Sequence, residues 1–330
     1  MLFLASSNLV YAKDYRNIIS FLEDNNISYN FFVTKRMLNE LKKLGSNPKG
    51  SVVVNYNLTP WIKDYAPQIY IPSMRNHDGH GFLLFFKYKP FYLKRVGKSF
   101  SEFQRYFEQR FVKSQGISSI SIDKPLDGGA VLTLVKEDAC LIIMVDEWDI
   151  NEEVFTSIFG SDSKIQLLKV PVENYFKHID GVLSLFPSLT RDNTYCLVYL
   201  DDETTRSWID KVCLIISDFL KVKVNAFPVP VDDSYRKFII DYRHYSCVVN
   251  SVVFPEIGTY AFLSYDPVSE MMSILNDVGF LSFLNAHGYK PAPILGDNLL
   301  RNGGGLACVV YNAWFLKPST LSSKESLQYN

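Results

Sequence analysis

The chain has 330 residues, of which 47% are hydrophobic and 21% are charged. Disordered chains carry little apolar material and much charge, so this composition excludes general disorder and predicts a folded globular protein. The 34 basic and 35 acidic residues leave a net charge of -1. No overall basic field is therefore present for a nucleic acid or an anionic membrane. The longest apolar run, residues 139–145, is too short to span a bilayer.

The N-terminus allows two interpretations. Residues 2–5 are apolar and residues 10–12 resemble a cleavage site, as in a signal peptide, but the basic residues that begin such peptides are missing. We favour a first core strand followed by a helix from about Lys13. The five cysteines are odd in number and show no Cys-x-x-Cys spacing, which predicts reduced thiols and a cytoplasmic protein.

Short apolar runs alternate with amphipathic segments along the chain. The runs that predict strands are residues 2–5, 29–34, 51–56, 81–86, 139–146, 165–170, 182–186, 195–200, 222–227, 246–254 and 306–311. The segments with apolar residues at helical spacing are residues 14–23, 35–44, 100–112, 151–159, 204–220 and 268–285. This alternation predicts an α/β fold. Because no hinge divides the chain, we expect one domain over residues 1–317 and a polar, frayed tail over residues 318–330.

A run of three glycines precedes a cysteine near the end of the chain. Gly303, Gly304 and Gly305 let a ligand approach the backbone closely, and Cys308 opens an apolar segment. The thiol of Cys308 is therefore a candidate nucleophile. The alternative is a flexible turn followed by a buried cysteine, because cysteine is among the most buried residue types.

His178 and Asp180 form a second candidate pair. If a strand begins here, its two-residue period places both side chains on one face, where a proton shuttle and a carboxylate serve one substrate. Alternatively, both face water at the start of a surface strand. A third candidate, Asp64, lies between Pro60 and Pro67 in a stiffened segment. Its alternative roles are pairing with a neighbouring lysine and capping a turn.

Two polar turns carry weaker signals. Asp127 and Gly128 separate two β-like runs and predict a hairpin, because Asp-Gly is a strong hairpin signal. His77 and His80 lie in a glycine-flanked loop with no third or fourth ligand nearby, so we expect no metal site there.

Taken in chain order, these motifs resemble the guanidino-group-modifying superfamily, and most closely its branch of agmatine deiminases and bacterial peptidylarginine deiminases. The matching segments are Trp61-Ile62-Lys63-Asp64-Tyr65-Ala66-Pro67 with Trp-x-Arg-Asp-x-Gly-Pro, Asp127-Gly128-Gly129 with an acidic residue and two glycines, and His178-Ile179-Asp180 with His-x-Asp. Asn250 and the apolar residues after it are similar to an Asn-bearing strand of that branch whose second Asn is absent here. The glycine run ends in Ala307-Cys308, where that branch has His-Cys. Lys63 and Ala66 are further departures.

The resemblance implies a pentein fold, in which five ββαβ-type modules surround a central site with pseudo-fivefold symmetry. It implies that Asp64 and Asp180 orient a planar guanidinium, while Cys308 attacks its central carbon to form a covalent thiouronium. His178 would donate a proton to the departing ammonia and then activate the water that releases a ureido product. Neither a metal nor an organic cofactor is needed.

The resemblance further implies that Trp61, Asp127, Gly304 and Gly305 contact the substrate. Arg301 would hold a substrate carboxylate, although Arg75, Arg236 and Arg243 are equally available and agmatine has no carboxylate to hold. The partner is thus a guanidino compound, with agmatine, free arginine and protein arginine all open. Two alternatives remain: an amidinotransferase with the same site, and a catalytically silent pentein that works as a binding protein, as Lys63 and Ala307 would allow.

Overall fold

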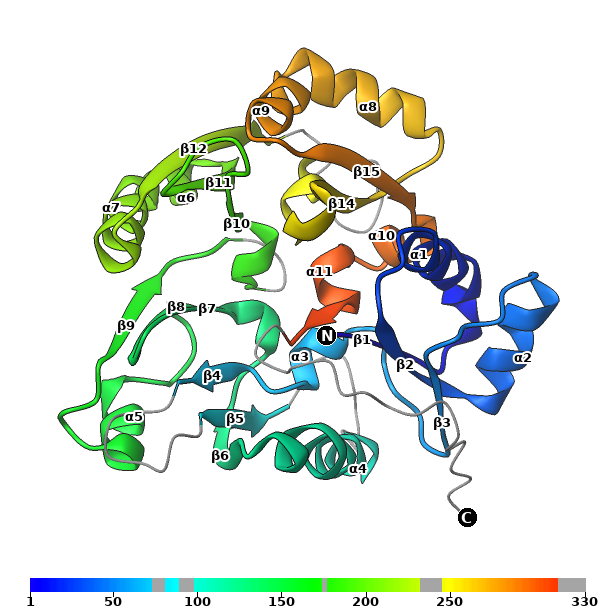
Figure 1. Ribbon diagram of the computed structural model, residues 1–330, viewed down its shortest axis with the longest axis horizontal. Helices are drawn as coiled ribbons and strands as arrows, with labels where there is room; N and C mark the ends of the chain where they lie inside the picture. The colour runs from blue at the N-terminus through cyan, green and yellow to red at the C-terminus, as the bar shows by residue number, and fades with distance from the viewer. Residues whose placement is uncertain (73–80, 89–97, 174–176, 232–244, 314–330) are drawn as a thin grey trace.

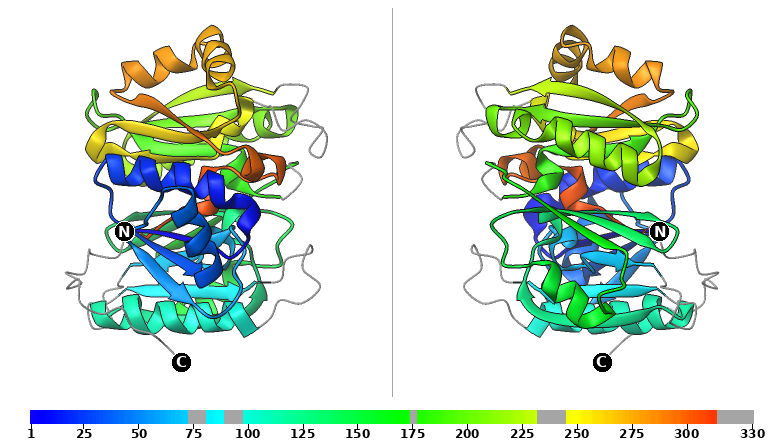
Figure 2. Two further views of the ribbon diagram at one scale, coloured as in Figure 1. Left: turned by 90° about the vertical axis from the view of Figure 1, so that its right-hand side faces the viewer. Right: turned by 90° about the vertical axis from the view of Figure 1, so that its left-hand side faces the viewer.

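A computed structural model describes residues 1–72, 81–88, 98–173, 177–231 and 245–313. Five small sheets are arranged around a common centre, and the longer helices lie on the outside of the molecule (Figures 1 and 2). The mixed α/β architecture predicted from the sequence is confirmed.

Four of the sheets are built in the same way from consecutive strands. Each has a first strand antiparallel to the second, and a second strand parallel to the third. The strands are β4 (Ile69–Ile71), β5 (Phe82–Lys87), β6 (Ser118–Pro125), β7 (Val131–Lys136), β8 (Ala139–Val145), β9 (Ile165–Val170), β10 (Leu183–Pro187), β11 (Thr194–Asp201), β12 (Lys223–Pro230), β13 (Ser251–Phe254), β14 (Thr259–Ser264) and β15 (Lys290–Leu295). The four units therefore repeat one structural module.

The fifth sheet joins the two ends of the described chain. Its strands run in the order β16 (Tyr311–Asn312), β1 (Leu2–Ser6), β2 (Tyr29–Thr34) and β3 (Ser51–Val54). β16 pairs antiparallel with β1, and β1 pairs parallel with β2, which repeats the pattern of the other modules. The expected N-terminal core strand is thus confirmed. This pairing closes the ring, because a strand from the C-terminal side completes the first module.

Helices connect the two parallel strands of every module, since a parallel connection needs a crossover. They are α1 (Ala12–Asp24) after β1, α4 (Lys98–Phe107) after β5, α5 (Glu152–Phe159) after β8, α6 (Glu203–Arg206) and α7 (Ile209–Leu220) after β11, and α8 (Val268–Asp277) and α9 (Phe280–Ala286) after β14. In addition, α2 (Lys35–Lys43) links β2 to β3. In α1 the buried Tyr15, Ile18, Ile19 and Leu22 lie on one helical face. Burying each such side chain contributes about 1.5–3 kcal/mol, which fixes the helix against the sheets.

Several predicted elements are corrected by the structure. The strand predicted over residues 306–311 is wrong, because α11 (Leu306–Val309) precedes the two-residue β16. The strand predicted over residues 246–254 begins instead as the 3-10 helix η6 (Tyr245–Val249). The hairpin predicted at Asp127 is also wrong, because β6 and β7 belong to different sheets. The backbone there forms the 3-10 turn η4 (Gly128–Ala130).

Five strands were not predicted: β4, β6, β7, β14 and β15. β15 contains Pro291 and Pro293, which argue against a central strand but are tolerated here because β15 is an edge strand. Within the described part of the chain, no helix is both long and apolar enough to cross a membrane. The predicted polar tail, and the loop with His77 and His80, lie outside the described residues.

Candidate active site

Five short segments from different modules converge near the centre of the ring. They are α3 (Ile62–Tyr65), η4, η5 (Ile179–Gly181), the residues after η6, and α11. In Figure 1, α3 and α11 lie side by side at the centre. These segments bring together Asp64, Asp127, His178, Asp180 and Cys308, which we call the central cluster. All five side chains are buried, with 4–8% of each residue exposed.

Asp64 is positioned by a one-turn helix between two prolines. Trp61 precedes α3, and the helix ends at Tyr65, with Ala66 as its C-cap directly before Pro67. The phenol of Tyr15 donates to the carbonyl oxygen of Pro60 over 3.2 Å and so ties this segment to α1. The stiffness expected from the two prolines stays a prediction, and the backbone at Asp64 forms one helical turn.

His178 and Asp180 are brought to the cluster by a 3-10 turn and not by a strand. His178 is the N-cap of η5, Asp180 lies within η5, and β10 begins only at Leu183. The prediction that a strand places both side chains on one face is therefore wrong, although both side chains do lie in the same site. His178 Nε2 lies 3.7 Å from Asp127 Oδ2. His178 also interacts with the thiol of Cys308, so the imidazole has both a carboxylate and a sulfur as neighbours.

Two glycines of the motifs leave room for site side chains. A Cβ atom on Gly129 would lie 2.3 Å from Nδ1 of His178, so the backbone packs directly on the imidazole. A Cβ atom on Gly304 would lie 1.9 Å from Cζ3 of Trp61. Any larger residue at either position must displace a ring. The glycines of both motifs are therefore needed for close packing, and Gly304 does not itself face an open ligand site in this arrangement.

Cys308 is held in α11 by a neighbouring asparagine. Asn250 Nδ2 donates to Cys308 Sγ over 3.3 Å, while Asn250 Oδ1 accepts a hydrogen bond of 2.9 Å from the backbone N–H of Ala307. The backbone N–H of Leu306 donates to the carbonyl oxygen of Asn250 over 3.1 Å. A Cβ atom on Gly305 would lie 2.4 Å from Asn250 Oδ1, which explains the glycine at that position. Asn250 thus connects β13 to the start of α11.

The charges of the central cluster are strongly coupled. The pKa of Asp64 is raised to about 7, chiefly by burial; His178 opposes the rise, and the carboxylates of Asp127 and Asp180 add to it. For His178, burial lowers the pKa, but attraction by Asp64 and hydrogen bonds to Asp127 and Cys308 outweigh this effect and raise the pKa well above its usual value. The neighbouring carboxylates therefore favour the protonated imidazole. Burial, and then Asp180, raise the pKa of Cys308.

Three carboxylate oxygens of the cluster are buried without a hydrogen-bond partner among the residues that the structure describes: Oδ1 of Asp64, of Asp127 and of Asp180. Buried carboxylate oxygens without donors are costly, because the desolvation of their charge is not compensated. A planar cation with several N–H donors would satisfy them together. The arrangement therefore suits a guanidinium or amidinium group beside a thiol and an imidazolium.

The remaining predicted residues differ in their placement. Trp61 is half-buried against Gly304, and its ring centroid lies 6.1 Å from that of Tyr11. Arg301 ends α10 (Asp297–Arg301) and is exposed, whereas the central cluster is buried. Arg75, Arg236 and Arg243 lie outside the described residues.

Two residues next to the cluster received no role from the sequence. Asn250 was noted only within a strand motif, and Lys63 only as a departure from the family pattern. Lys63 Nζ forms an ion pair of 2.8 Å with Asp180 Oδ2. A basic residue beside Asp64 in the sequence was the only signal for this contact, because Asp180 is 117 residues away.

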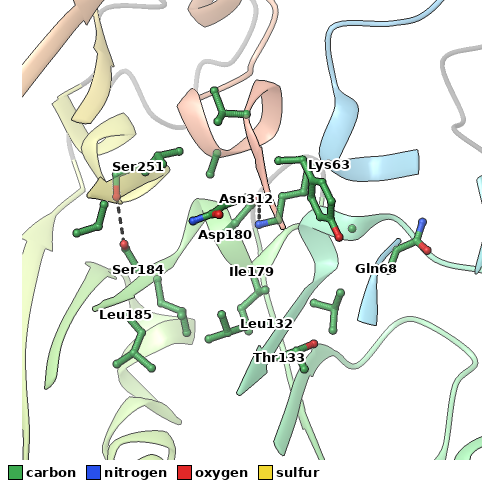
Figure 3. Close-up of a pocket in the computed structure, with 18 of the residues that line it drawn as sticks. Lys63, Gln68, Leu132, Thr133, Ile179, Asp180, Ser184, Leu185, Ser251 and Asn312 are labelled. Atoms are coloured by element: carbon green, nitrogen blue, oxygen red, sulfur yellow. Dashed lines mark hydrogen bonds and ion pairs between the residues drawn. The ribbon is translucent and has the colours of Figure 1, made fainter. Parts of the chain in front are cut away.

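A cavity of about 290 Å³ adjoins the cluster, and Lys63 and Asp180 stand at its edge (Figure 3). It is lined by residues of β4, β7, β10, β13 and β16, that is, by the first strand of each of the five modules. These strands therefore face the axis of the ring.

No protein-family model matches the sequence, and no curated protein is similar to it in sequence. Solved structures do share its fold. The agmatine deiminase of C. jejuni has a TM-score of 0.58 and 14% identity, over 94% of this chain and 92% of that chain. The agmatine deiminase of Enterococcus faecalis has a TM-score of 0.59 and 12% identity over the same shares. A third protein, provisionally named a peptidyl-arginine deiminase, has a TM-score of 0.61 and 15% identity over 94% of each chain.

The chain thus has the pentein fold, as its motifs implied. Its five-module ring extends over the described residues, and proteins of the agmatine deiminase branch are among the solved structures with this architecture. At identities of 12–15%, the likeness shows the fold, and the function must be argued from the residues of the central cluster.

Proposed function

We propose that the protein is a cysteine-dependent deiminase that hydrolyses a guanidino group to a ureido group and ammonia. The observation that carries the proposal is the central cluster itself. Four chain segments far apart in sequence place a thiol, a protonated imidazole and three carboxylates with unsatisfied oxygens in one buried site. A structural core would not gather these costly groups, since each buried charge must be compensated.

Binding would use the carboxylates. Guanidinium is planar, cationic and resonance-stabilised, so it reacts poorly until its N–H groups are held and a strong nucleophile lies against its carbon. The free oxygens of Asp64 and Asp180 would accept its N–H donors. The substrate's positive charge would also favour the thiolate of Cys308, whose pKa is raised by burial in the free protein.

The reaction would proceed in two covalent steps. The Cys308 thiolate attacks the guanidinium carbon and forms a C–S bond; the C–N bond then breaks, and His178 transfers a proton to the departing ammonia. In the second step His178 takes a proton from water, whose oxygen attacks the same carbon. The C–S bond breaks as the C=O bond of the ureido product forms and its hydroxyl proton leaves to solvent, and the thiolate is restored. The Asp127 carboxylate beside His178 stabilises the imidazolium in both steps.

The experiment is ammonia release from agmatine, free arginine and a peptide with an internal arginine. Each is measured with the wild-type protein, with Cys308→Ala, and with Cys213→Ala as a matched control on the outer helix α7. We expect release from at least one compound, loss of release in Cys308→Ala, and retention in Cys213→Ala. The compound that reacts also defines the substrate class.

Other outcomes would contradict the proposal in distinct ways. Full activity in Cys308→Ala would exclude the cysteine mechanism. Silence with all three compounds, followed by turnover when an amine acceptor is added, would indicate an amidinotransferase. Silence under both conditions would indicate a binding protein, an alternative supported by the Lys63 ion pair that already occupies one oxygen of Asp180.

A further inference from the structure

Lys63 places a positive charge at the edge of the central cluster. Its Nζ lies 2.8 Å from Asp180 Oδ2, and the two side chains are only 23% and 9% exposed (Figure 3). The backbone at Lys63 is fixed by close packing, since a Cβ atom on Gly128 would lie 2.0 Å from its carbonyl oxygen. The ion pair is therefore largely buried and its Lys63 backbone is fixed, unlike an exposed surface pair, whose geometry is loose.

The ion pair engages only one oxygen of the carboxylate. Asp180 Oδ2 is taken by Lys63, while Asp180 Oδ1 is buried without a partner. The same carboxylate acts on Cys308 and disfavours its thiolate, as Asp64 also does. His178 favours the thiolate and so opposes the effect of both carboxylates, and Asp127 lies next to His178. A cation paired with Asp180 therefore offsets the repulsion between this carboxylate and the thiolate of Cys308.

The charge balance of the site supports this function. The cluster contains three carboxylates, and His178 with Lys63 supplies two positive charges. With a neutral thiol and all three carboxylates ionised, as at a pH above the pKa of about 7 of Asp64, the site carries about one net negative charge, which one monovalent guanidinium would balance. Without Lys63 the site would carry about two net negative charges, and about three if Cys308 were a thiolate. The low polarity of a buried site makes each such charge expensive.

We propose that Lys63 is a positioning residue that acts through Asp180: its ammonium neutralises this carboxylate toward Cys308 and holds it so that Oδ1 stays available for a guanidinium N–H. The role in substrate binding rests on the proposed function, whereas the effect on the thiol does not. Lys63 itself need not touch the substrate, because Lys63 contacts Oδ2 of Asp180 and the substrate would contact Oδ1.

The test is a double-mutant cycle that removes the charges of Lys63 and Asp180. Its readout is the reactivity of the Cys308 thiol, so it requires no turnover. The rate at which iodoacetamide alkylates Cys308 is measured against pH by mass spectrometry of the Cys308 peptide, in wild type, Lys63→Met, Lys63→Arg, Asp180→Asn and Lys63→Met/Asp180→Asn. A neutral reagent reports the thiolate fraction alone.

In Lys63→Met we expect the midpoint to lie at a pH about 1 higher, because Asp180 is left uncompensated. Lys63→Arg keeps the positive charge and should retain the wild-type midpoint. Asp180→Asn should lower the midpoint, and the double variant should return close to wild type, because the two opposite charges are removed together. Lys87→Met is the control, since Lys87 forms an exposed pair with Asp123, 2.9 Å away, and should leave the midpoint unchanged.

An unchanged or lowered midpoint in Lys63→Met would overturn the proposal. So would a double variant that stays displaced like Lys63→Met, because a packing defect is not cancelled by a second neutral substitution. If Lys63→Met does not fold, the double variant carries the test through its comparison with Asp180→Asn: the midpoint should be higher in the double variant, and equal midpoints would overturn the proposal. A failure of the deiminase proposal is seen separately, as absent ammonia release from the wild-type protein, and leaves this cycle interpretable.

Discussion

The side-chain amide of Asn250 donates a hydrogen bond of 3.3 Å to the sulfur of Cys308 and at the same time accepts one of 2.9 Å from the backbone N–H of Ala307. Asn250, which directly precedes β13, therefore fixes both the backbone and the nucleophilic atom of α11. An N–H donor aimed at sulfur favours the thiolate over the thiol.

The first prediction concerns this contact. In Asn250→Ala we expect kcat for the reactive guanidine to fall about 10- to 100-fold, because a hydrogen bond to a charged group contributes roughly 1.5–3 kcal/mol. Asn250→Asp should lose more, since a second negative charge would face the thiolate. Steady-state ammonia release gives the rates, and thermal unfolding shows whether each variant is folded. Unchanged kcat in a folded Asn250→Ala would contradict the assigned contact.

A second prediction follows from the packing of Gly129 on His178. Gly129→Ala forces a methyl group to within 2.3 Å of Nδ1, so the imidazole must move away from Asp127 and Cys308. We expect a loss of turnover together with a destabilisation of about 1–3 kcal/mol, as for other overpacked sites.

The matched control is Gly296→Ala, whose new methyl group would lie 2.9 Å from Leu263 Cδ2, outside the central cluster. This variant should retain its activity per folded molecule, although its stability falls. If both alanine variants lost activity in proportion to their stability alone, the placement of His178 would not be the cause.

The buried carboxyl group of Asp64 should lower the free energy of unfolding at the pH where it is ionised. Its pKa is raised to about 7 because of burial and the neighbouring carboxylates, so its ionised form is disfavoured in the folded state. Stability from this group is fully present below its ordinary pKa of about 4 and is lost as the pH rises toward 7. Asp64→Asn should therefore abolish turnover while it raises the unfolding temperature at pH 8. A lower unfolding temperature at that pH would show that the carboxylate stabilises the fold.

Asp14 should produce a separate pH dependence of stability. This carboxylate on α1 accepts a hydrogen bond of 2.8 Å from the backbone N–H of Leu299 in α10, yet burial raises its pKa to about 6. The hydrogen bond opposes this rise and nearby Asp297 adds to it. Because the folded state holds the proton more tightly, the free energy of unfolding should fall between about pH 4 and pH 6, by on the order of 2 kcal/mol.

The measurement compares urea unfolding of the wild-type protein and Asp14→Asn over this pH range. The asparagine keeps an acceptor for Leu299 but cannot ionise, so the difference between the two proteins isolates Asp14. The difference should grow from pH 4 to pH 6 in favour of Asp14→Asn and then remain level. A constant difference would show that Asp14 titrates as it does in the unfolded chain.

The sequence determined the fold class and most of the chemical groups. Amphipathic spacing predicted the helices α1, α2 and α5 nearly to their ends, because their buried faces are continuous and local. The ordered motifs around Asp64, His178 and Cys308 predicted both the five-module fold and the residues of the central cluster. Short motifs with unusual residues remain readable where the overall identity to known structures is very low.

Only the tertiary structure decided how these groups meet. The strand faces expected for His178 and Asp180 were wrong, since a 3-10 turn directs both side chains to the centre. The β16 strand closes the ring by pairing with β1 across the whole described chain, and no local pattern encodes that pairing. The ion pair of Lys63 with Asp180 spans 117 residues. Contacts between distant segments depend on how the modules pack around the axis, which periodicity along the chain does not specify.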